Sequence, residues 1–205
     1  MEIWIASTNR GKVAEFESIF EPLTNAGWKI KTPQDLEFYF APEENGASFA
    51  DNARIKARSL RAVAPHGVWI VADDSGLAVE GLNGLPGIHS ARYAGPKASD
   101  AENRSKLIKM MALKPMANRN AAFVCALHAF DPQGAELLFE SRCEGEIGKT
   151  EMGKNGFGYD ALFIPHHPEN TGKKTMAEIT PELKNRLSHR GQAARLLLDH
   201  LLKAL

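Results

Sequence analysis

Short apolar runs alternate with segments of helical periodicity along the first part of this 205-residue chain. Residues 3–6 and 68–72 are apolar enough to form buried strands, and residues 28–30 predict a third strand. In the intervening stretches, residues 13–20 and a segment that begins at Ser48 repeat apolar side chains at helical spacing. Strands that are separated by helices in this way are typical of an α/β fold.

A turn sequence, residues 131–134, separates two further apolar segments. Residues 121–130 and 135–144 flank this turn, and the pattern predicts a β-hairpin. Because hairpin strands are antiparallel, the sheet is expected to be mixed. The predicted order of elements is βαβ, helix, strand, a long loop over residues 81–95, helix, hairpin and helix. The predicted fold class is therefore α/β with a mixed β-sheet.

Capping residues and prolines predict where several helices begin and end. Glu21-Pro22 is expected to end the first helix. Ser99 and Glu102 form a capping box at the start of another helix, which Lys114-Pro115 closes. Thr180-Pro181 begins a last helical region, because proline is favoured at the first helical position. Residues 192–205 continue that region with an apolar face of Ala193, Leu196, Leu197, Leu201 and Leu205.

The charge balance argues against a nucleic-acid binder that relies on overall basic charge, because the 25 Lys and Arg residues are matched by 25 Asp and Glu residues. A local basic site is compatible with this balance. No apolar stretch approaches the roughly 20 residues that span a bilayer. The N-terminus has no pattern of a signal peptide. The two cysteines form no CxxC pair, and Cys125 lies in an apolar run that predicts a buried, inert thiol. We expect a cytoplasmic protein without a nucleic-acid or membrane partner.

The polar loop Ser7-Thr8-Asn9-Arg10-Gly11-Lys12 follows the first predicted strand and precedes a helix. The free N–H groups at a helix N-terminus bind anions, and Lys12 adds a positive charge there. The loop therefore indicates a phosphate site, although it lacks the GxxxxGK[ST] pattern. An ordinary polar turn between strand and helix is the alternative.

Two adjacent acids, Asp73 and Asp74, follow the buried run 68–72. Ligands of α/β proteins bind at strand ends, and adjacent strand residues point to opposite faces. One of the two acids is therefore expected to face a site while the other binds local backbone. Paired carboxylates suit Mg²⁺, and Glu43-Glu44 could complete such a site. The alternatives are a simple turn at residues 73–76 and solvated glutamates.

Two segments in the second half carry aromatic or basic residues that could contact a ligand. In residues 155–160, Phe157 and Tyr159 lie between glycines and could stack on a nucleobase. Core aromatics at the start of a strand are the alternative. Residues 188–191 bring together a hydroxyl, an imidazole and a guanidinium, and Lys184 lies about one turn earlier. An exposed junction between helices is the alternative. No histidine pattern predicts zinc.

Six short segments taken together are more specific than any one of them. They are Ser7-Thr8-Asn9-x-Gly11-Lys12, Glu43-Glu44, Ala72-Asp73-Asp74-Ser75-Gly76-Leu77, residues 86–93, Gly156-Phe157-Gly158-Tyr159-Asp160 and Ser188-His189-Arg190-Gly191. From residue 3 to about residue 200, the chain resembles the inosine/xanthosine triphosphate pyrophosphatase family, the non-canonical purine NTP pyrophosphatases. It departs from many members at Thr8, where they have a glycine.

The resemblance implies a fold and an activity. The fold would be a single domain over residues 1–205, in which a long mixed β-sheet and flanking helices form two lobes around a central cleft. The activity would be hydrolysis of the non-canonical purine nucleotides ITP, dITP and XTP to the monophosphate and pyrophosphate, which cleanses the nucleotide pool. The resemblance also implies Mg²⁺ as the cofactor and a homodimer.

The resemblance assigns roles to residues motif by motif. Asp74 would be the general base and a metal ligand, and Asp73, Glu43 and Glu44 are the other candidate ligands of Mg²⁺. Independently of the resemblance, a hydrogen-bond donor, either Arg190 or a backbone N–H, is expected to bind the oxygen at position 6 of the purine. The residues expected to bind the nucleotide are Ser7, Thr8, Asn9, Arg10, Gly11, Lys12, Ser75, Phe157, Gly158, Tyr159, Asp160, Lys184, His189 and Arg190.

Two other functions stay open at this point. A pyrophosphatase of the related septum-inhibition (Maf) group would act on other nucleoside triphosphates, but its typical Ser-x-Ser-x-x-Arg start is absent here. A nucleotide-binding regulator without catalysis would not need the acid pair Asp73-Asp74.

Overall fold

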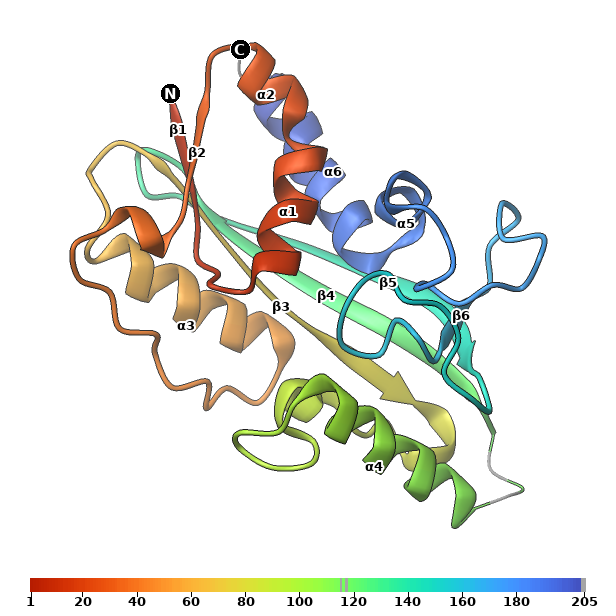
Figure 1. Cartoon of the computed structure of the whole chain (residues 1–205). Coiled ribbons are helices and arrows are strands. Elements are labelled where there is room, and N and C mark those ends of the chain that lie inside the picture. The colour runs from red at the N-terminus through yellow and green to blue at the C-terminus, as the bar shows by residue number, and fades with distance from the viewer. Residues whose placement is uncertain (115, 117, 204–205) are drawn as a thin grey trace. The chain divides into compact units, whose positions relative to one another are not determined.

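The structure is a computed structural model that describes residues 1–114, 116 and 118–203. Over these residues the chain forms strands, α-helices and three short 3₁₀ helices (Figure 1). The strands are β1 (Glu2–Ile5), β2 (Lys29–Lys31), β3 (Trp69–Val79), β4 (Asn120–Phe130), β5 (Glu136–Ile147) and β6 (Phe163–Pro165). The α-helices are α1 (Arg10–Ile19), α2 (Glu21–Asn25), α3 (Phe49–Arg61), α4 (Asp100–Ala112), α5 (Pro181–Leu187) and α6 (His189–Leu202). The 3₁₀ helices are η1 (Pro33–Asp35), η2 (Glu80–Leu82) and η3 (Gly87–Arg92).

The strands form one sheet in the order β2-β1-β3-β4-β5-β6. Strand β1 runs parallel to both β2 and β3, and Ile3 pairs with Ile30 on one side and with Trp69 on the other. Strands β5 and β6 are antiparallel. The predicted α/β fold with a mixed sheet is therefore confirmed. The predicted hairpin is confirmed too, because β4 and β5 are neighbours joined at Asp131–Ala135, while β6 was not predicted.

The contacts of the chain divide it into two compact units. Unit 1 comprises Met1–Asp74, Cys125–Ser141 and Arg190–Leu205, and unit 2 comprises Ser75–Val124 and Arg142–His189. Strands β3, β4 and β5 contribute residues to both units.

In unit 1, alternate residues of the central strands face different helices, as the two-residue period of a strand requires. Ile3 and Ile5 of β1 and Val71 of β3 belong to one buried cluster with helices α1, α2 and α6, which lie together in Figure 1. Trp4 of β1 and Ile70 of β3 belong to a second buried cluster with α3. The sheet of unit 1 therefore has α1 and α6 on one face and α3 on the other.

In unit 2, one hydrophobic cluster joins the last residues of β3 to helix α4. Leu77 and Val79 of β3 pack with Leu107 and Met111 of α4. The capping box of α4 is present as predicted, since Ser99 Oγ accepts from the Glu102 amide and the Glu102 carboxylate accepts from the Ser99 amide. The predicted long loop over residues 81–95 instead contains η2 and η3.

The helix boundaries agree in part with the predictions. Helix α1 ends at Ile19, just before Glu21-Pro22 as predicted, but Pro22 then lies in the first turn of a new helix, α2, where its missing N–H costs nothing. Residues 188–191 lie where α5 is followed by α6, but the alternative of an exposed junction is wrong, because Ser188, His189 and Arg190 are buried. Leu196 of α6 is exposed, while Leu198 is buried in its place. The predicted helix stop at Pro115 and the apolar position Leu205 lie outside the described residues.

The predicted strand end at Asp73 is also wrong. Strand β3 continues without interruption from Trp69 to Val79, so the sequence Asp73-Asp74-Ser75-Gly76 is extended rather than a turn. The register explains why the acids still lie at a strand end. Ile5 pairs with Val71, and the neighbouring strand β1 stops at Ile5, two residues before β3 reaches Asp73.

Among the described residues, no helix combines the length and apolar character needed to cross a bilayer. Cys125 is fully buried and reduced, and burial raises the pKa of its thiol to about 12. The predicted burial of this thiol is confirmed, and a buried thiol with a raised pKa is expected to be inert.

Candidate active site

The loop between β1 and α1 is organised by Asn9, the N-cap of α1. Its side-chain oxygen accepts a hydrogen bond of 3.1 Å from the Lys12 amide, and its own amide donates to Ser7 Oγ at 3.2 Å. These bonds fix the loop and leave Thr8 and Arg10 exposed. A helix N-terminus that follows a parallel strand is a natural site for an anion.

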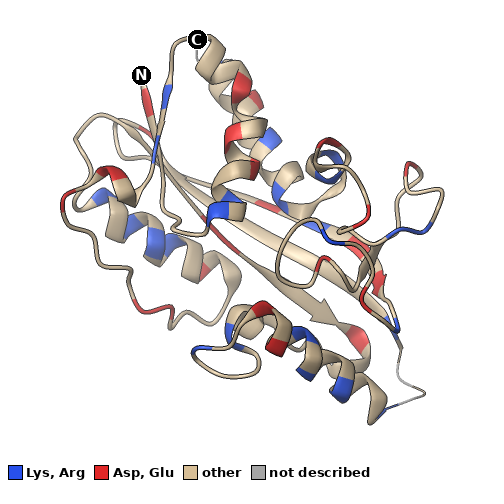
Figure 2. Ribbon diagram, viewed as in Figure 1, with Lys and Arg blue, Asp and Glu red and all other residues tan. Residues whose placement is uncertain are grey.

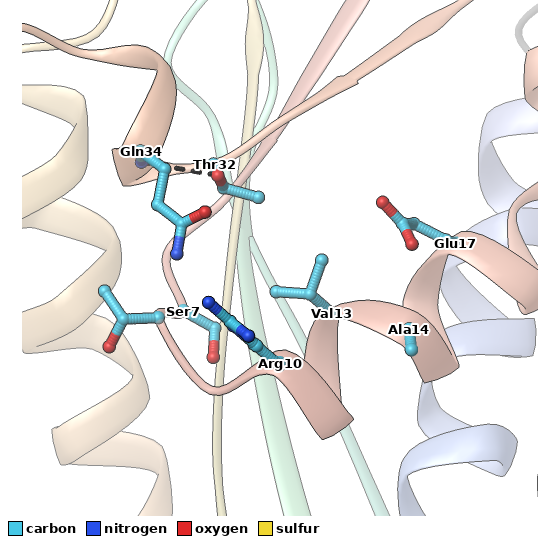
Figure 3. A pocket seen from close by; sticks show the side chains of 8 residues that line it. Ser7, Arg10, Val13, Ala14, Glu17, Thr32 and Gln34 are labelled. Carbon is cyan, nitrogen blue, oxygen red and sulfur yellow. Dashed lines mark hydrogen bonds between the residues drawn. The ribbon is translucent and has the colours of Figure 1, made fainter.

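A pocket of about 200 Å³ opens beside this loop (Figure 3). Ser7, Thr8 and Arg10 line it from the loop and the first turn of α1, and Thr32 and Gln34 line it from the segment after β2. Figure 3 shows the side chains of Arg10 and Gln34 extending toward the same space. The predicted phosphate loop therefore borders a real pocket that offers a guanidinium, hydroxyls and an amide.

Asp73 lies on the sheet face that carries α1 and α6, because it continues the alternation of Trp69 and Val71. Its Oδ2 atom accepts from Lys12 Nζ at 2.9 Å and from Arg190 Nε and Nη2 at 3.1 Å each. Arg190 also donates to Glu15 Oε2. Only 2% of Asp73 and 2% of Arg190 are exposed, so this is a buried ion-pair cluster.

Electrostatics hold the Asp73 cluster in its charged form. Burial alone would raise the pKa of Asp73, but the charges of Lys12 and Arg190 outweigh it and leave that pKa well below its ordinary value. Burial would lower the pKa of Arg190, yet Asp73 and Glu15 raise it. For Lys12, burial has the larger effect and lowers the pKa of the ammonium group.

Asp74 lies on the opposite sheet face, toward α3. Its Oδ1 accepts from Lys56 Nζ at 2.7 Å, and its Oδ2 accepts from Asn52 Nδ2 at 3.2 Å. The same Lys56 ammonium lies 3.5 Å from Glu44 Oε2. Burial raises the pKa of Asp74 more than the positive charge of Lys56 lowers it. Asp74 is therefore a carboxylate that accepts a proton more readily than an ordinary aspartate.

The two acids lie at a switch point of the sheet. Strand β1 connects through α1 to β2 on one side, and β3 follows α3 on the other side. In open α/β sheets, ligands bind at the carboxyl ends of strands where the order reverses in this way. The loop after β1 and the acids of β3 both lie at that place.

A second group of predicted residues lies within unit 2. Lys184 is only 8% exposed, donates to Asp160 Oδ2 at 2.6 Å, and places its ammonium 4.6 Å from the centre of the Phe157 ring. Asp160 also accepts from the Phe157 amide at 2.8 Å, which fixes the glycine-rich turn. His189 stacks on Phe123, with ring centres 4.7 Å apart.

The sequence as a whole is similar to that of known proteins. The model of the Ham1 family matches residues 3–200. The chain belongs to the Ham1 family. A dITP/XTP pyrophosphatase of Bdellovibrio bacteriovorus is 48% identical over 201 residues, which cover 98% of each chain. A dITP/XTP pyrophosphatase of Corynebacterium glutamicum (strain R) is 42% identical over 98% of this chain and 97% of its own length.

The fold agrees with that of solved Ham1 proteins. The structure of a HAM1 protein from Coxiella burnetii superposes with a TM-score of 0.84 at 37% identity and covers 99% of both chains. The family resemblance read from the six motifs is thereby confirmed, and so is the fold class.

Three residues that the motifs did not indicate join the candidate site of this Ham1 chain. Asn52 and Lys56 are one turn apart on α3 and both bind Asp74, and Glu15 of α1 binds Arg190. A spacing of four residues on a helix was a usable signal for Asn52 and Lys56, since it predicts a shared face. Nothing local indicated Glu15.

The four carboxylates predicted to bind metal do not all lie around one point. Asp73 binds Lys12 and Arg190 on the face opposite to Asp74, and Glu43 is exposed. Within the described part of the chain, no three His, Cys, Asp or Glu side chains gather around one point. Asp74 and Glu44 do converge, on Lys56. This donor set fits Mg²⁺, which is commonly held by one or two carboxylates together with substrate phosphates.

Proposed function

We propose that this Ham1 chain is a dITP/XTP pyrophosphatase, an enzyme that hydrolyses non-canonical purine triphosphates such as dITP, XTP and ITP to the monophosphate and pyrophosphate. One observation carries the proposal. The chain aligns over 98% of its length with a dITP/XTP pyrophosphatase. The buried Asp74 with its raised pKa supports the proposal, because hydrolysis needs a proton acceptor.

The triphosphate is proposed to bind to unit 1 at the loop Ser7–Lys12. The N-terminal amides of α1, the Arg10 guanidinium and the Lys12 ammonium offer positive charge and hydrogen-bond donors to phosphate oxygens. Asn9 fixes the loop through its bonds to Ser7 and Lys12. Ser75 follows Asp74 in β3 and is proposed to contact the nucleotide there. Gly11, which has no side chain, is proposed to let the phosphates approach the backbone.

Asp74 is proposed to be the general base. Its carboxylate accepts a proton from water as the water oxygen bonds to phosphorus, and the bridging P–O bond between the α- and β-phosphates breaks. Pyrophosphate leaves with the electrons of that bond. Lys56 and Asn52 orient the Asp74 carboxylate by hydrogen bonds to its two oxygens. General-base catalysis of this kind is typically worth about 10²–10⁴-fold.

Asp74 and Glu44 are proposed to hold Mg²⁺ together with the phosphates. When bound, the ion would supply charge stabilisation to the phosphoryl oxygens. Asp73, which shares its carboxylate with Lys12 and Arg190, is proposed to position these cations rather than to bind metal. Arg190 in turn is proposed to hold the Asp73 carboxylate in place. Its predicted bond to the purine is not part of this proposal, because the buried guanidinium donates to Asp73 and Glu15.

The purine base is proposed to bind to the group in unit 2. Phe157 offers an aromatic face to a base, and Gly158 and Tyr159 belong to the same turn. Lys184 and His189 carry donors suited to the oxygen at position 6 of hypoxanthine and xanthine, where adenine has an amino group. A mispaired buried polar group costs about 1–3 kcal/mol, and this cost would disfavour ATP. Asp160 positions Lys184.

Three further expectations stay predictions. These are that residues 1–205 act as one domain with two lobes, that the enzyme is a homodimer, and that it works in the cytoplasm.

A panel of nucleotides tests the proposed function. With Mg²⁺ present, we expect kcat/KM for dITP and XTP to exceed that for dATP by at least about tenfold, because the adenine amino group leaves a donor unpaired. Release of pyrophosphate is measured with a coupled inorganic pyrophosphatase. Preference for dTTP or UTP would instead favour the activity of the Maf group. Binding of dITP without turnover would favour a non-catalytic regulator.

A further inference from the structure

A second recess, of about 340 Å³, lies within unit 2 and is separate from the residues assigned above. The segment after β5 lines it with Lys149 and Thr150, and the segment after β6 lines it with Lys173, Lys174 and Thr175. Figure 2 shows basic residues on the loop that follows β6. The volume falls within the range of about 300–1,000 Å³ that is usual for small-molecule sites.

The charges around this recess are unbalanced. Three lysines, Lys149, Lys173 and Lys174, line the recess together with one acidic residue, Glu178. The Glu178 carboxylate already accepts from the Thr175 amide at 2.9 Å and lies 3.1 Å from the Thr175 hydroxyl. Among the described residues, none of the three lysines forms an ion pair with a carboxylate. Like charges that share a recess repel one another unless an anion joins them.

The two lining segments are fixed to each other and to the strands. The Thr175 hydroxyl donates to the Met152 carbonyl at 2.8 Å, which links the segment after β6 to the segment after β5. Buried Asn170 donates to the carbonyls of Pro165 and Lys174 and accepts from the Lys174 amide. The backbone that carries the lysines is therefore held in place without a ligand, as a pre-formed binding site requires.

We propose that this recess binds a small anion with two or more phosphoryl groups, of which inorganic pyrophosphate is the smallest. The net positive charge of the lining calls for a multivalent anion rather than a single carboxylate. Lysine ammonium groups bind phosphate as point charges, and the Thr150 hydroxyl can donate to a phosphoryl oxygen. A free pyrophosphate and the phosphate chain of a nucleotide share this chemistry.

The test is a calorimetric titration of the full chain with inorganic pyrophosphate in the absence of divalent metal. The variant combines Lys149→Gln, Lys173→Asn and Lys174→Gln. Asparagine is chosen at 173 because the φ of Lys173 is 48°, a conformation that asparagine tolerates well. A matched control, Lys97→Gln, Lys109→Gln and Lys114→Gln, removes the same charge from exposed lysines of unit 2.

We expect the recess variant to bind pyrophosphate at least about tenfold more weakly, while the control stays within about twofold of the unsubstituted chain. Amide chemical shifts of Gly148 and Gly172 locate the site, since these glycines line the recess and not the proposed active site. Both shifts should move on titration in the unsubstituted chain. Equal affinity in the recess variant, or shifts that stay unchanged at millimolar pyrophosphate, would overturn the proposal.

Two further measurements are made. One distinguishes free pyrophosphate from the phosphate chain of a nucleotide as the bound anion, and the other distinguishes failure of this proposal from failure of the proposed function. The first arm is a titration with dATP. If the recess binds the phosphate chain of a nucleotide, dATP should change the chemical shifts of Gly148 and Gly172. If the recess is too narrow for a nucleoside, only pyrophosphate should change them. Turnover of dITP is measured on the same samples. Absence of turnover would contradict the proposed function but not the binding of pyrophosphate to the recess, because the residues that line the recess are not the proposed catalytic residues.

Discussion

Replacing Asp74 by asparagine should lower kcat for dITP by at least about 10²-fold while the fold is retained. The amide keeps the shape, and its single oxygen can still accept from one of the two donors, Lys56 or Asn52. It can neither act as a base nor contribute a negative charge to a metal. Steady-state kinetics measure the change, and circular dichroism checks the fold. The control is Asp199→Asn on α6, which removes an exposed carboxylate and should leave kcat unchanged.

The pH profile adds a second readout for Asp74. Burial raises the pKa of this carboxyl above its ordinary value, so kcat/KM should fall as the pH drops through that raised pKa and the base becomes protonated. The residual activity of Asp74→Asn should lack this acidic limb. A folded variant with kcat close to that of the unsubstituted enzyme would move the role of base to another residue.

Replacing Asp73 by asparagine should reduce the free energy of unfolding by about 3–5 kcal/mol at neutral pH. The substitution leaves the buried Arg190 and the partly buried Lys12 with Glu15 as the remaining carboxylate of the cluster. Urea unfolding measures the loss. The control is Glu144→Gln, which breaks a pair with Arg142 at the surface and should cost no more than about 1 kcal/mol. Equal losses for the two variants would contradict the buried cluster.

The contribution of Asp73 should depend on pH with a definite sign. Its pKa is lowered in the folded state, so the folded state keeps the carboxylate charged at pH values where the unfolded chain takes up a proton. The stabilisation is present above the unfolded pKa of about 3.9 and is lost as the pH falls below it. The difference in unfolding free energy between the unsubstituted chain and Asp73→Asn should therefore become smaller at acidic pH.

Local rules predicted the helix starts well because each cap bond spans only three residues. The N-caps Ser48, Ser99 and Thr180 accept from the amides of Asp51, Glu102 and Leu183, and each could be read from a short window of sequence. The family resemblance likewise depended on short motifs in a fixed order. These features carry their information in consecutive residues, which a single sequence displays.

The extended course of Asp73-Asp74-Ser75-Gly76 could not be predicted in this way. Locally these residues favour a turn. Their extended conformation belongs to a strand that lies between β1 and β4 in the sheet. The side-chain partners are also far away in the chain, since Lys12 is 61 positions from Asp73 and Arg190 is 117 positions away. For the same reason the burial of Arg190 was not foreseen, and its guanidinium was expected at a purine. Strand pairing and long-range ion pairs, rather than local propensity, set the geometry of the candidate site.

The products formed from dITP test the central claim most directly. Phosphorus NMR of a reaction with Mg²⁺ distinguishes cleavage between the α- and β-phosphates from removal of the terminal phosphate. We expect dIMP and pyrophosphate in equal amounts, and a much slower reaction with dATP. Appearance of dIDP and inorganic phosphate, or equal rates with dITP and dATP, would contradict the assignment of this chain as a dITP/XTP pyrophosphatase.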